Sequence, residues 1–333
     1  MKKVLFISII LLQTCFGQDI HFSQFFNSPL QINPALAGQI DKKARFAANQ
    51  RVQYRSISGN PYNTFAISGD VFEPYQKEKY GAGASIMHDI TGDSKFRTLQ
   101  INLAGSYIIP IDSNQSLSIG IQPGFTHRTI DYSALSFDSQ YNGFQYDPNL
   151  NNNENFQKDA RNYFNLILGL NYKINIKERA WGSAGFALYN ITKPKQTFFA
   201  DDNIKLDRRA SINLEGQYPI NLKWDLQPKM FMMFQGKYKE IIIGTLGKYT
   251  IINERGVYRA AYAGTLYRNG DAGYIFAGFD YNDWHLGLSY DINLSNLKPA
   301  SLRRGGWEIA LIYKINPFIY KSEQHRVCPD YMF

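Results

Sequence analysis

The chain has 333 residues, a formal net charge of +8 and 44% hydrophobic residues, and aromatic residues reach 15%. Its mean hydropathy of −0.34 is ordinary for a water-soluble protein, and beyond the first 17 residues no apolar run is long enough for a transmembrane helix. The lysines and arginines are scattered and form no basic tract interleaved with aromatic residues, so we expect no nucleic-acid partner.

Residues 1–17 have the organisation of a secretory signal peptide. A positively charged start precedes an apolar stretch at residues 4–12, which is too short to span a bilayer, and small residues stand at the −3 and −1 positions of a cleavage site. We predict cleavage between Gly17 and Gln18. Lipid attachment at Cys15 is the alternative, although the residues on either side of it fit a lipoprotein site poorly.

The next segment, residues 18–43, lacks the pattern of a regular strand or helix. Pro29 and Pro34 restrict the chain and oppose regular structure in the residues before them. Phe22 and two further phenylalanines provide apolar side chains for packing. We therefore predict an ordered N-terminal periplasmic arm that packs under or into the domain that follows.

Strand patterns begin near residue 44 and continue almost to residue 316. In five segments apolar side chains alternate with polar or small ones, with aromatic residues near the segment ends; these lie within residues 99–109, 117–125, 164–173, 284–292 and 307–315. Weaker patterns occur at about 44–54, 64–74, 79–90, 179–190, 208–219, 222–235, 237–250, 257–267 and 271–280. A period of two over about ten residues is typical of a transmembrane β-strand.

The lengths of the connections support about fourteen strands. If both ends of the barrel face the periplasm, the odd-numbered connections lie outside the cell, where barrels carry their long loops. The three longest connections are the fifth, seventh and thirteenth, at residues 131–161, 191–207 and 293–305. We therefore predict an all-β fold: a transmembrane antiparallel β-barrel over residues 44–316, followed by a C-terminal periplasmic tail over residues 317–333.

Four prolines lie within the predicted strands. Pro110 and Pro219 fit strand ends, whereas Pro123 and Pro228 imply bulges or misplaced boundaries. The alternative to the membrane barrel is a soluble β-rich periplasmic protein, either a long sandwich or two barrels. Such a protein would have to pair its many apolar stripes face to face.

The sequence predicts no catalytic, cofactor or metal site, and hence no enzyme. The five histidines have no zinc-binding spacing, and neither a nucleophile elbow nor a phosphate-binding loop occurs. Ser289 and His285 share one strand face, but polar side chains are the default inside a barrel. Loss of Cys15 with the signal peptide would leave Cys328 alone, which excludes a disulfide within the mature chain.

The segment after the predicted cleavage site carries a specific combination of motifs: Phe22-Ser23-Gln24, Pro29-Leu30 and Asn33-Pro34-Ala35-x-Ala37-Gly38. The chain ends on Cys328-Pro329-Asp330-Tyr331-Met332-Phe333. Together these features resemble the PorP/SprF family of the type IX secretion system of Bacteroidetes. The length, the signal peptide and the strand-rich body agree with the family, so the resemblance covers essentially the whole chain.

The resemblance implies an outer-membrane protein that associates with the type IX secretion machinery. It implies support for the secretion or surface attachment of a cognate adhesin or other cargo protein, and a link to gliding motility in some members. Whether the motif residues dock a partner or merely cap the barrel is left open. Outer-membrane lipid around the barrel is a further expected partner. The polar inward faces of the strands favour, as an alternative function, an outer-membrane porin or solute transporter.

Overall fold

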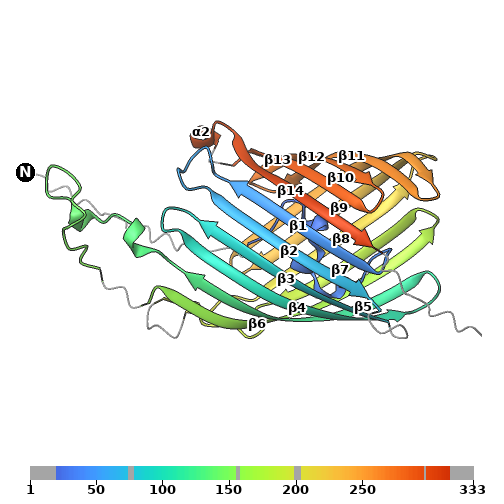
Figure 1. Ribbon diagram of the computed structural model, residues 1–333, viewed down its shortest axis with the longest axis horizontal. Coiled ribbons are helices and arrows are strands. Elements are labelled where there is room, and N and C mark those ends of the chain that lie inside the picture. The colour runs from blue at the N-terminus through green and yellow to red at the C-terminus, as the bar shows by residue number, and fades with distance from the viewer. Residues whose placement is uncertain (1–19, 74–78, 155–157, 199–203, 296–297, 316–333) are drawn as a thin grey trace, which may run out of the picture.

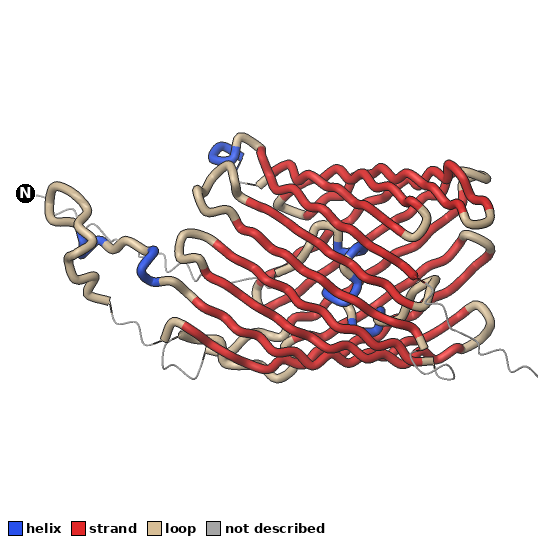
Figure 2. The backbone as a smooth tube through the Cα atoms, in the orientation of Figure 1, coloured by secondary structure: helices blue, strands red, loops and turns tan. Residues whose placement is uncertain are grey.

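The structure is a computed structural model that describes residues 20–73, 79–154, 158–198, 204–295 and 298–315. Within these residues fourteen antiparallel strands close into one barrel, in which each strand pairs with its neighbours in sequence and β1 pairs with β14. The strands are strongly tilted against the barrel axis (Figures 1 and 2). The predicted all-β barrel and the predicted number of strands are confirmed.

The strands of the barrel are β1 (Ala44–Gln53), β2 (Tyr62–Phe72), β3 (Tyr80–Thr91), β4 (Phe96–Pro110), β5 (Gln115–Thr129), β6 (Ala160–Lys177), β7 (Ala180–Tyr189), β8 (Arg209–Pro219), β9 (Trp224–Gln235), β10 (Tyr238–Glu254), β11 (Val257–Arg268), β12 (Ala272–Tyr281), β13 (Trp284–Asn293) and β14 (Arg304–Ile315). The predicted segments overlap all of them. The predicted range falls furthest short of the observed strand for β6. Its ladder to β5 continues past the alternating apolar residues as far as Ala160.

Apolar side chains face outward and polar side chains face the interior. In β4, Leu103 is 60% exposed, whereas its neighbour Asn102 is buried. Because successive strand residues point to opposite faces, the period of two in the sequence becomes an apolar outer surface and a polar lumen. A bilayer would cover this apolar outer surface.

Two prolines lie inside strands without shifting the register. Pro123 of β5 pairs with Leu166 of β6, and Pro228 of β9 pairs with Thr245 of β10. The bulges or boundary errors predicted at these positions are therefore wrong. A missing N–H removes one ladder hydrogen bond, and the many remaining bonds on both sides hold each strand in place. The other two strand prolines end β4 and β8, as predicted.

The two ends of the barrel differ in the length of their connections. One end, which we call the long-loop end, carries the connections at 130–159, 190–208 and 294–303. The first of these includes η3 (Tyr132–Ala134) and η4 (Asp138–Gln140), and the third includes α2 (Lys298–Ser301). The opposite, short-turn end carries turns such as 178–179 and 255–256. The chain enters β1 and leaves β14 at the short-turn end (Figure 1).

Residues 20–43, which we call the plug, precede β1, and their three short helices lie inside the barrel (Figure 2). The plug contains three short helices, η1 (Phe25–Asn27), α1 (Pro29–Ile32) and η2 (Pro34–Leu36). Among the described residues no helix is long and apolar enough to cross a bilayer. The predicted signal peptide with its Gly17–Gln18 cleavage site and the predicted tail with Cys328 lie outside the described residues.

Candidate functional site

The plug takes its shape from local sequence signals. Pro29 and Pro34 each stand at the start of a helical turn, where the missing N–H and the restricted φ of proline are compatible with a helix. The side chain of Asn33 accepts a hydrogen bond from the backbone N–H of Ala35 at 2.9 Å, which caps η2. The motif Asn33-Pro34-Ala35 is therefore a capped helical turn inside the lumen.

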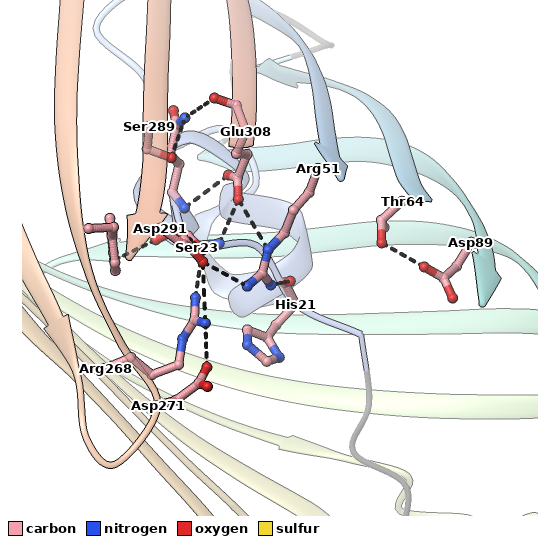
Figure 3. A network of polar contacts seen from close by, with 12 residues as sticks. His21, Ser23, Arg51, Thr64, Asp89, Arg268, Asp271, Ser289, Asp291 and Glu308 are labelled. Atoms are coloured by element: carbon pink, nitrogen blue, oxygen red, sulfur yellow. Dashed lines mark hydrogen bonds and ion pairs between the residues drawn. The ribbon is translucent and has the colours of Figure 1, made fainter. Parts of the chain in front are cut away.

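The motif residues Ser23 and Gln24 are bound by side chains from the last strands of the barrel. Their backbone N–H groups donate to the two carboxylate oxygens of Glu308 at 2.7 and 2.9 Å (Figure 3). The Ser23 carbonyl accepts from the hydroxyl of Tyr274 at 2.7 Å, and the Ser23 hydroxyl donates to Asp291 at 3.2 Å. The two N–H groups and the Ser23 carbonyl therefore have hydrogen-bond partners within the protein.

Two arginines balance the buried acids around Ser23. The guanidinium of Arg51 lies 3.4 Å from Asp291 and 3.8 Å from Glu308, and that of Arg268 lies 3.5 Å from Asp291 (Figure 3). Each of these four side chains is at most 5% exposed. Buried charges are tolerated when they are paired and hydrogen-bonded, so this network is stable only while Ser23 and the arginines stay in place.

A further polar contact ties the start of the plug to β10. Nε2 of His21 lies 3.0 Å from Glu240, and the His21 carbonyl accepts from Arg51 at 2.6 Å. Within the described residues no group of three or more His, Cys, Asp and Glu side chains is arranged to hold a metal ion. The polar groups around residues 21–24 thus bind the plug to the barrel.

Apolar contacts hold the plug between these polar anchors. Phe25 stacks on Phe231 of β9 with ring centroids 5.3 Å apart, and it shares a buried cluster with Ile32. Phe22 packs in a separate cluster against Met87 of β3. The phenylalanines of the plug therefore pack into the barrel and not under it.

Asn33 connects the plug to the opposite side of the barrel. Its amide nitrogen donates to the carbonyls of Leu170 and Phe186 at 2.9 and 3.4 Å, and to the side-chain oxygen of Asn213 at 3.3 Å. Tyr189 donates to the Gln31 carbonyl at 3.0 Å. Strands β6, β7 and β8 thus bind the middle of the plug as β13 and β14 bind its start.

Glycines in the barrel wall make room for the plug. A β-carbon on Gly120 of β5 would overlap the backbone of Ala35, and one on Gly83 of β3 would stand 2.9 Å from a methyl carbon of Leu30. A β-carbon on Gly287 of β13 would stand 2.6 Å from the side-chain oxygen of Gln24. Glycine in a strand often marks a place where another backbone approaches closely, and here the approaching segment is the plug.

The plug ends in a turn that leads into β1. Gly38 has a φ of +70°, which a residue with a side chain rarely adopts, and its N–H donates to Asp70 at 2.8 Å. Arg45 binds the same carboxylate at 2.8 Å and donates to the Leu36 carbonyl at 3.3 Å. The positive φ, and the distance of only 2.7 Å from a β-carbon at this position to the backbone of Gly81, explain the need for glycine at the last motif position.

The structure brings the predicted motif residues together in the lumen, where they are buried. It does not bring Ser289 and His285 together: Ser289 accepts from Gln24 at 3.1 Å, whereas His285 binds Asp280 at 2.6 Å. Sequence reasoning missed Glu308 and the other wall groups that hold the plug. Their signal was only a charged residue on the inward face of a strand, which is common in barrels.

A cavity of about 750 Å³ lies beside the plug, toward the short-turn end. Plug residues such as Phe26 and Leu36 line one side of it, and inward-facing residues of β6–β14 line the other. A much smaller cavity of about 30 Å³ lies beside Ile20 and Gln31. The described part of the plug thus leaves a sizeable space beside it in the lumen.

Comparison with known proteins identifies the family. Residues 14–313 match the family described as type IX secretion system membrane protein PorP/SprF. No curated protein matches the sequence significantly. Among solved structures, the toluene transporter TodX of Pseudomonas putida is similar in fold, with a TM-score of 0.52 and 11% identity over 86% of this chain and 92% of that one. A FadL homologue of Pseudomonas aeruginosa has a TM-score of 0.49 and 12% identity over 85% and 92% of the two chains.

The family match spans nearly the whole chain, and it agrees with the closed fourteen-stranded barrel with an apolar outer surface. The similarity to TodX concerns the fold, at an identity too low to carry function. The chain belongs to the PorP/SprF family of type IX secretion system membrane proteins, and it is a β-barrel of the outer membrane.

Proposed function

We propose that the protein is a non-enzymatic component of the type IX secretion system that supports the secretion or surface attachment of a cognate cargo protein, such as an adhesin, and that it contributes to gliding motility in cells that glide. The observation that carries this proposal, together with the family match, is the anchored plug. Residues 20–38 are anchored to β1, β6 and β14 by hydrogen bonds. A barrel whose lumen holds an anchored plug is suited to binding proteins at its two ends.

We further propose an orientation and a domain organisation. The short-turn end faces the periplasm and the long-loop end faces the outside, because outer-membrane barrels carry short turns on the periplasmic side. Residues 1–17 are a cleaved signal peptide, residues 18–43 an arm that serves as the plug, and residues 317–333 a periplasmic tail. The motif residues anchor the plug; their burial speaks against direct contact with the secretion machinery.

The connection between β5 and β6 is the proposed contact for cargo. It projects beyond the barrel rim (Figure 1), and its tip is closed by a bridge between Tyr141 and Tyr146. Phe144, within this tip, is 94% exposed, and the two tyrosines are 57% and 46% exposed. Aromatic residues are enriched in protein interfaces, so an exposed aromatic tip favours a protein partner.

Deletion of the gene tests the proposal. We expect the deletion strain to lose surface display of one cargo protein while other type IX substrates are still secreted, and the wild-type gene to restore display. Unchanged surface proteins in the deletion strain would refute the proposal. Loss of every substrate would instead indicate a general part of the machinery.

The alternative function is that of an outer-membrane porin or solute transporter. The polar inward faces of the strands and the transporter among the similar folds motivate it, although that likeness concerns the fold alone. Planar-bilayer recordings separate the two functions. We expect the complete protein to show little steady conductance and a variant lacking residues 20–38 to conduct. Steady conductance of the complete protein would favour a porin.

A further inference from the structure

The cavity beside the plug opens at the short-turn end of the barrel. Its lining includes Gly256 and Val257 at the β10–β11 turn, and Asn282 and Asp283 at the β12–β13 turn. Its volume of about 750 Å³ is within the range of roughly 300–1,000 Å³ that is usual for ligand sites. The proposed orientation makes this space accessible from the periplasm.

Most charged groups in the cavity are already paired with each other. Lys229 lies 2.9 Å from Glu215, and Lys314 lies 3.0 Å from Asp41. Lys42 forms an ion pair with Asp283. Asp280 accepts from Tyr262 and binds His285, each at 2.6 Å. The lysine–carboxylate pairs are neutral overall, and the Asp280 carboxylate is held by two hydrogen bonds.

Two lysines of the cavity wall are less fully paired than the other charged groups. Within the described residues Lys173 of β6 has no carboxylate within ion-pair distance, and its ammonium lies 5.9 Å from the ring centre of Trp181. Lys248 of β10 lies 4.0 Å from Asp225, but that carboxylate already binds Arg179 at 2.6 Å. The cavity wall therefore carries cationic groups that an incoming carboxylate could bind.

One further carboxylate of the lining lies away from these two lysines. Glu254 also lines the cavity, but it stands at the exposed rim, beside the β10–β11 turn. Lys173 and Lys248 are only partly exposed and lie further inside, on inward faces of their strands. Electrostatic attraction for an anion therefore increases from the rim toward the interior, where the lower dielectric strengthens it.

We propose that this cavity binds an acidic peptide segment of a periplasmic partner protein, with carboxylates on Lys173 and Lys248 and apolar parts against Trp181. Side-chain amides at Gln217 and Gln227 also line the cavity. Gln227 donates to Gln217 at 2.8 Å and Gln217 donates to the Arg179 carbonyl at 3.1 Å, which leaves the Gln227 side-chain oxygen to accept from a peptide N–H. The mixture of cations, amides and aromatic rings fits a polypeptide better than a bare inorganic anion. The inference rests on the proposed function for its periplasmic orientation.

Binding of synthetic peptides to the purified complete protein in nanodiscs tests this proposal. The probe is a short fluorescent peptide rich in Asp and Glu, compared with a matched peptide in which Lys replaces the acids. We expect binding of the acidic peptide only, weakened by salt because the Coulomb attraction is screened. Free acetate or phosphate at the same anion concentration should not displace it.

Substitution of the two lysines locates the site. Lys173→Met and Lys248→Met should each weaken binding of the acidic peptide roughly tenfold, the usual scale for losing one charged hydrogen bond. The matched control is Lys223→Met, which removes an exposed lysine of the β8–β9 turn that does not line the cavity. Heat-modified migration on gels confirms that each variant is folded.

Three results would overturn the inference: equal binding of both peptides, unchanged affinity in the two cavity variants, or displacement by acetate or phosphate as effective as by peptide. The last would indicate a site for small anions. Because the assay uses purified protein, its failure is distinguishable from failure of the cargo proposal, which is measured by surface display in cells.

Discussion

Ala35 of the plug lies against Gly120 of β5 so closely that a β-carbon on the glycine would overlap the alanine backbone. The contact joins a motif residue near the start of the chain to a barrel strand that lies 85 residues further along it. It indicates that the plug and the wall are fitted to each other. The plug is therefore an integral part of the folded barrel.

Substitution of Gly120 should displace the plug. We expect Gly120→Val to raise single-channel conductance in planar bilayers and to expose residues 20–43 to added protease, because the valine side chain occupies the space of Ala35. The control is Gly105→Val in β4, where a β-carbon meets only Ile121 at 4.0 Å. Wild-type conductance and protease resistance in Gly120→Val would show that the plug is not held as described.

A carboxylate in place of the Asn33 amide should loosen the middle of the plug. Asn33→Asp keeps the side-chain oxygen that accepts from the Ala35 N–H. It replaces the amide NH₂ group by a second oxygen, which then faces the carbonyl oxygens of Leu170 and Phe186. Since a buried donor–acceptor pair left unmade costs about 1–3 kcal/mol, and a charge costs more, we expect a lower thermal midpoint in detergent.

The control for this variant is Asn142→Asp in the exposed β5–β6 connection. There the side-chain oxygen accepts from the N–H groups of Phe144 and Gln145 at 3.0 Å, and aspartate can do the same. Its thermal midpoint should equal that of the wild type. Equal midpoints for both variants would contradict the role assigned to Asn33.

Removal of one hydroxyl should release the start of the plug. Tyr274→Phe leaves the buried carbonyl of Ser23 without the donor that lies 2.7 Å away. We expect the free energy of local opening near Ser23 to fall by about 1–3 kcal/mol, so that the backbone amides there exchange hydrogen faster. Tyr290→Phe, on the outward face of β13 and 41% exposed, is the control. Unchanged exchange in Tyr274→Phe would mean that the arginine–carboxylate network alone holds this segment.

The exposed aromatic tip provides a test of cargo contact that does not involve stability. Phe144→Ser should leave the thermal midpoint unchanged, because the side chain is 94% exposed, and should reduce surface display of the cargo. Leu222→Ser, at an exposed turn of the short-turn end, is the control and should display cargo normally. Normal display by Phe144→Ser would remove the tip from the proposed cargo contact.

Much of the barrel was predictable because its signal is local. Each strand is indicated by apolar and polar residues that alternate within about ten positions, as Leu103 and Asn102 illustrate. The lengths of the connections then support the number of strands. The turn at Asn33-Pro34 was equally predictable as a break in regular structure. What failed were local rules at Pro123 and Pro228, where long ladders on both sides outweigh one missing hydrogen bond.

The sequence by itself determined the barrel, the approximate number of strands and an irregular arm before the first strand, because these depend on patterns between near neighbours. Only the tertiary structure decided that the arm fills the lumen and which wall groups hold it. Ser23 meets Glu308 at a separation of 285 residues, and Ala35 meets Gly120 only when the sheet has closed. Contacts of this kind have no period in the sequence, since barrel closure brings their partners together.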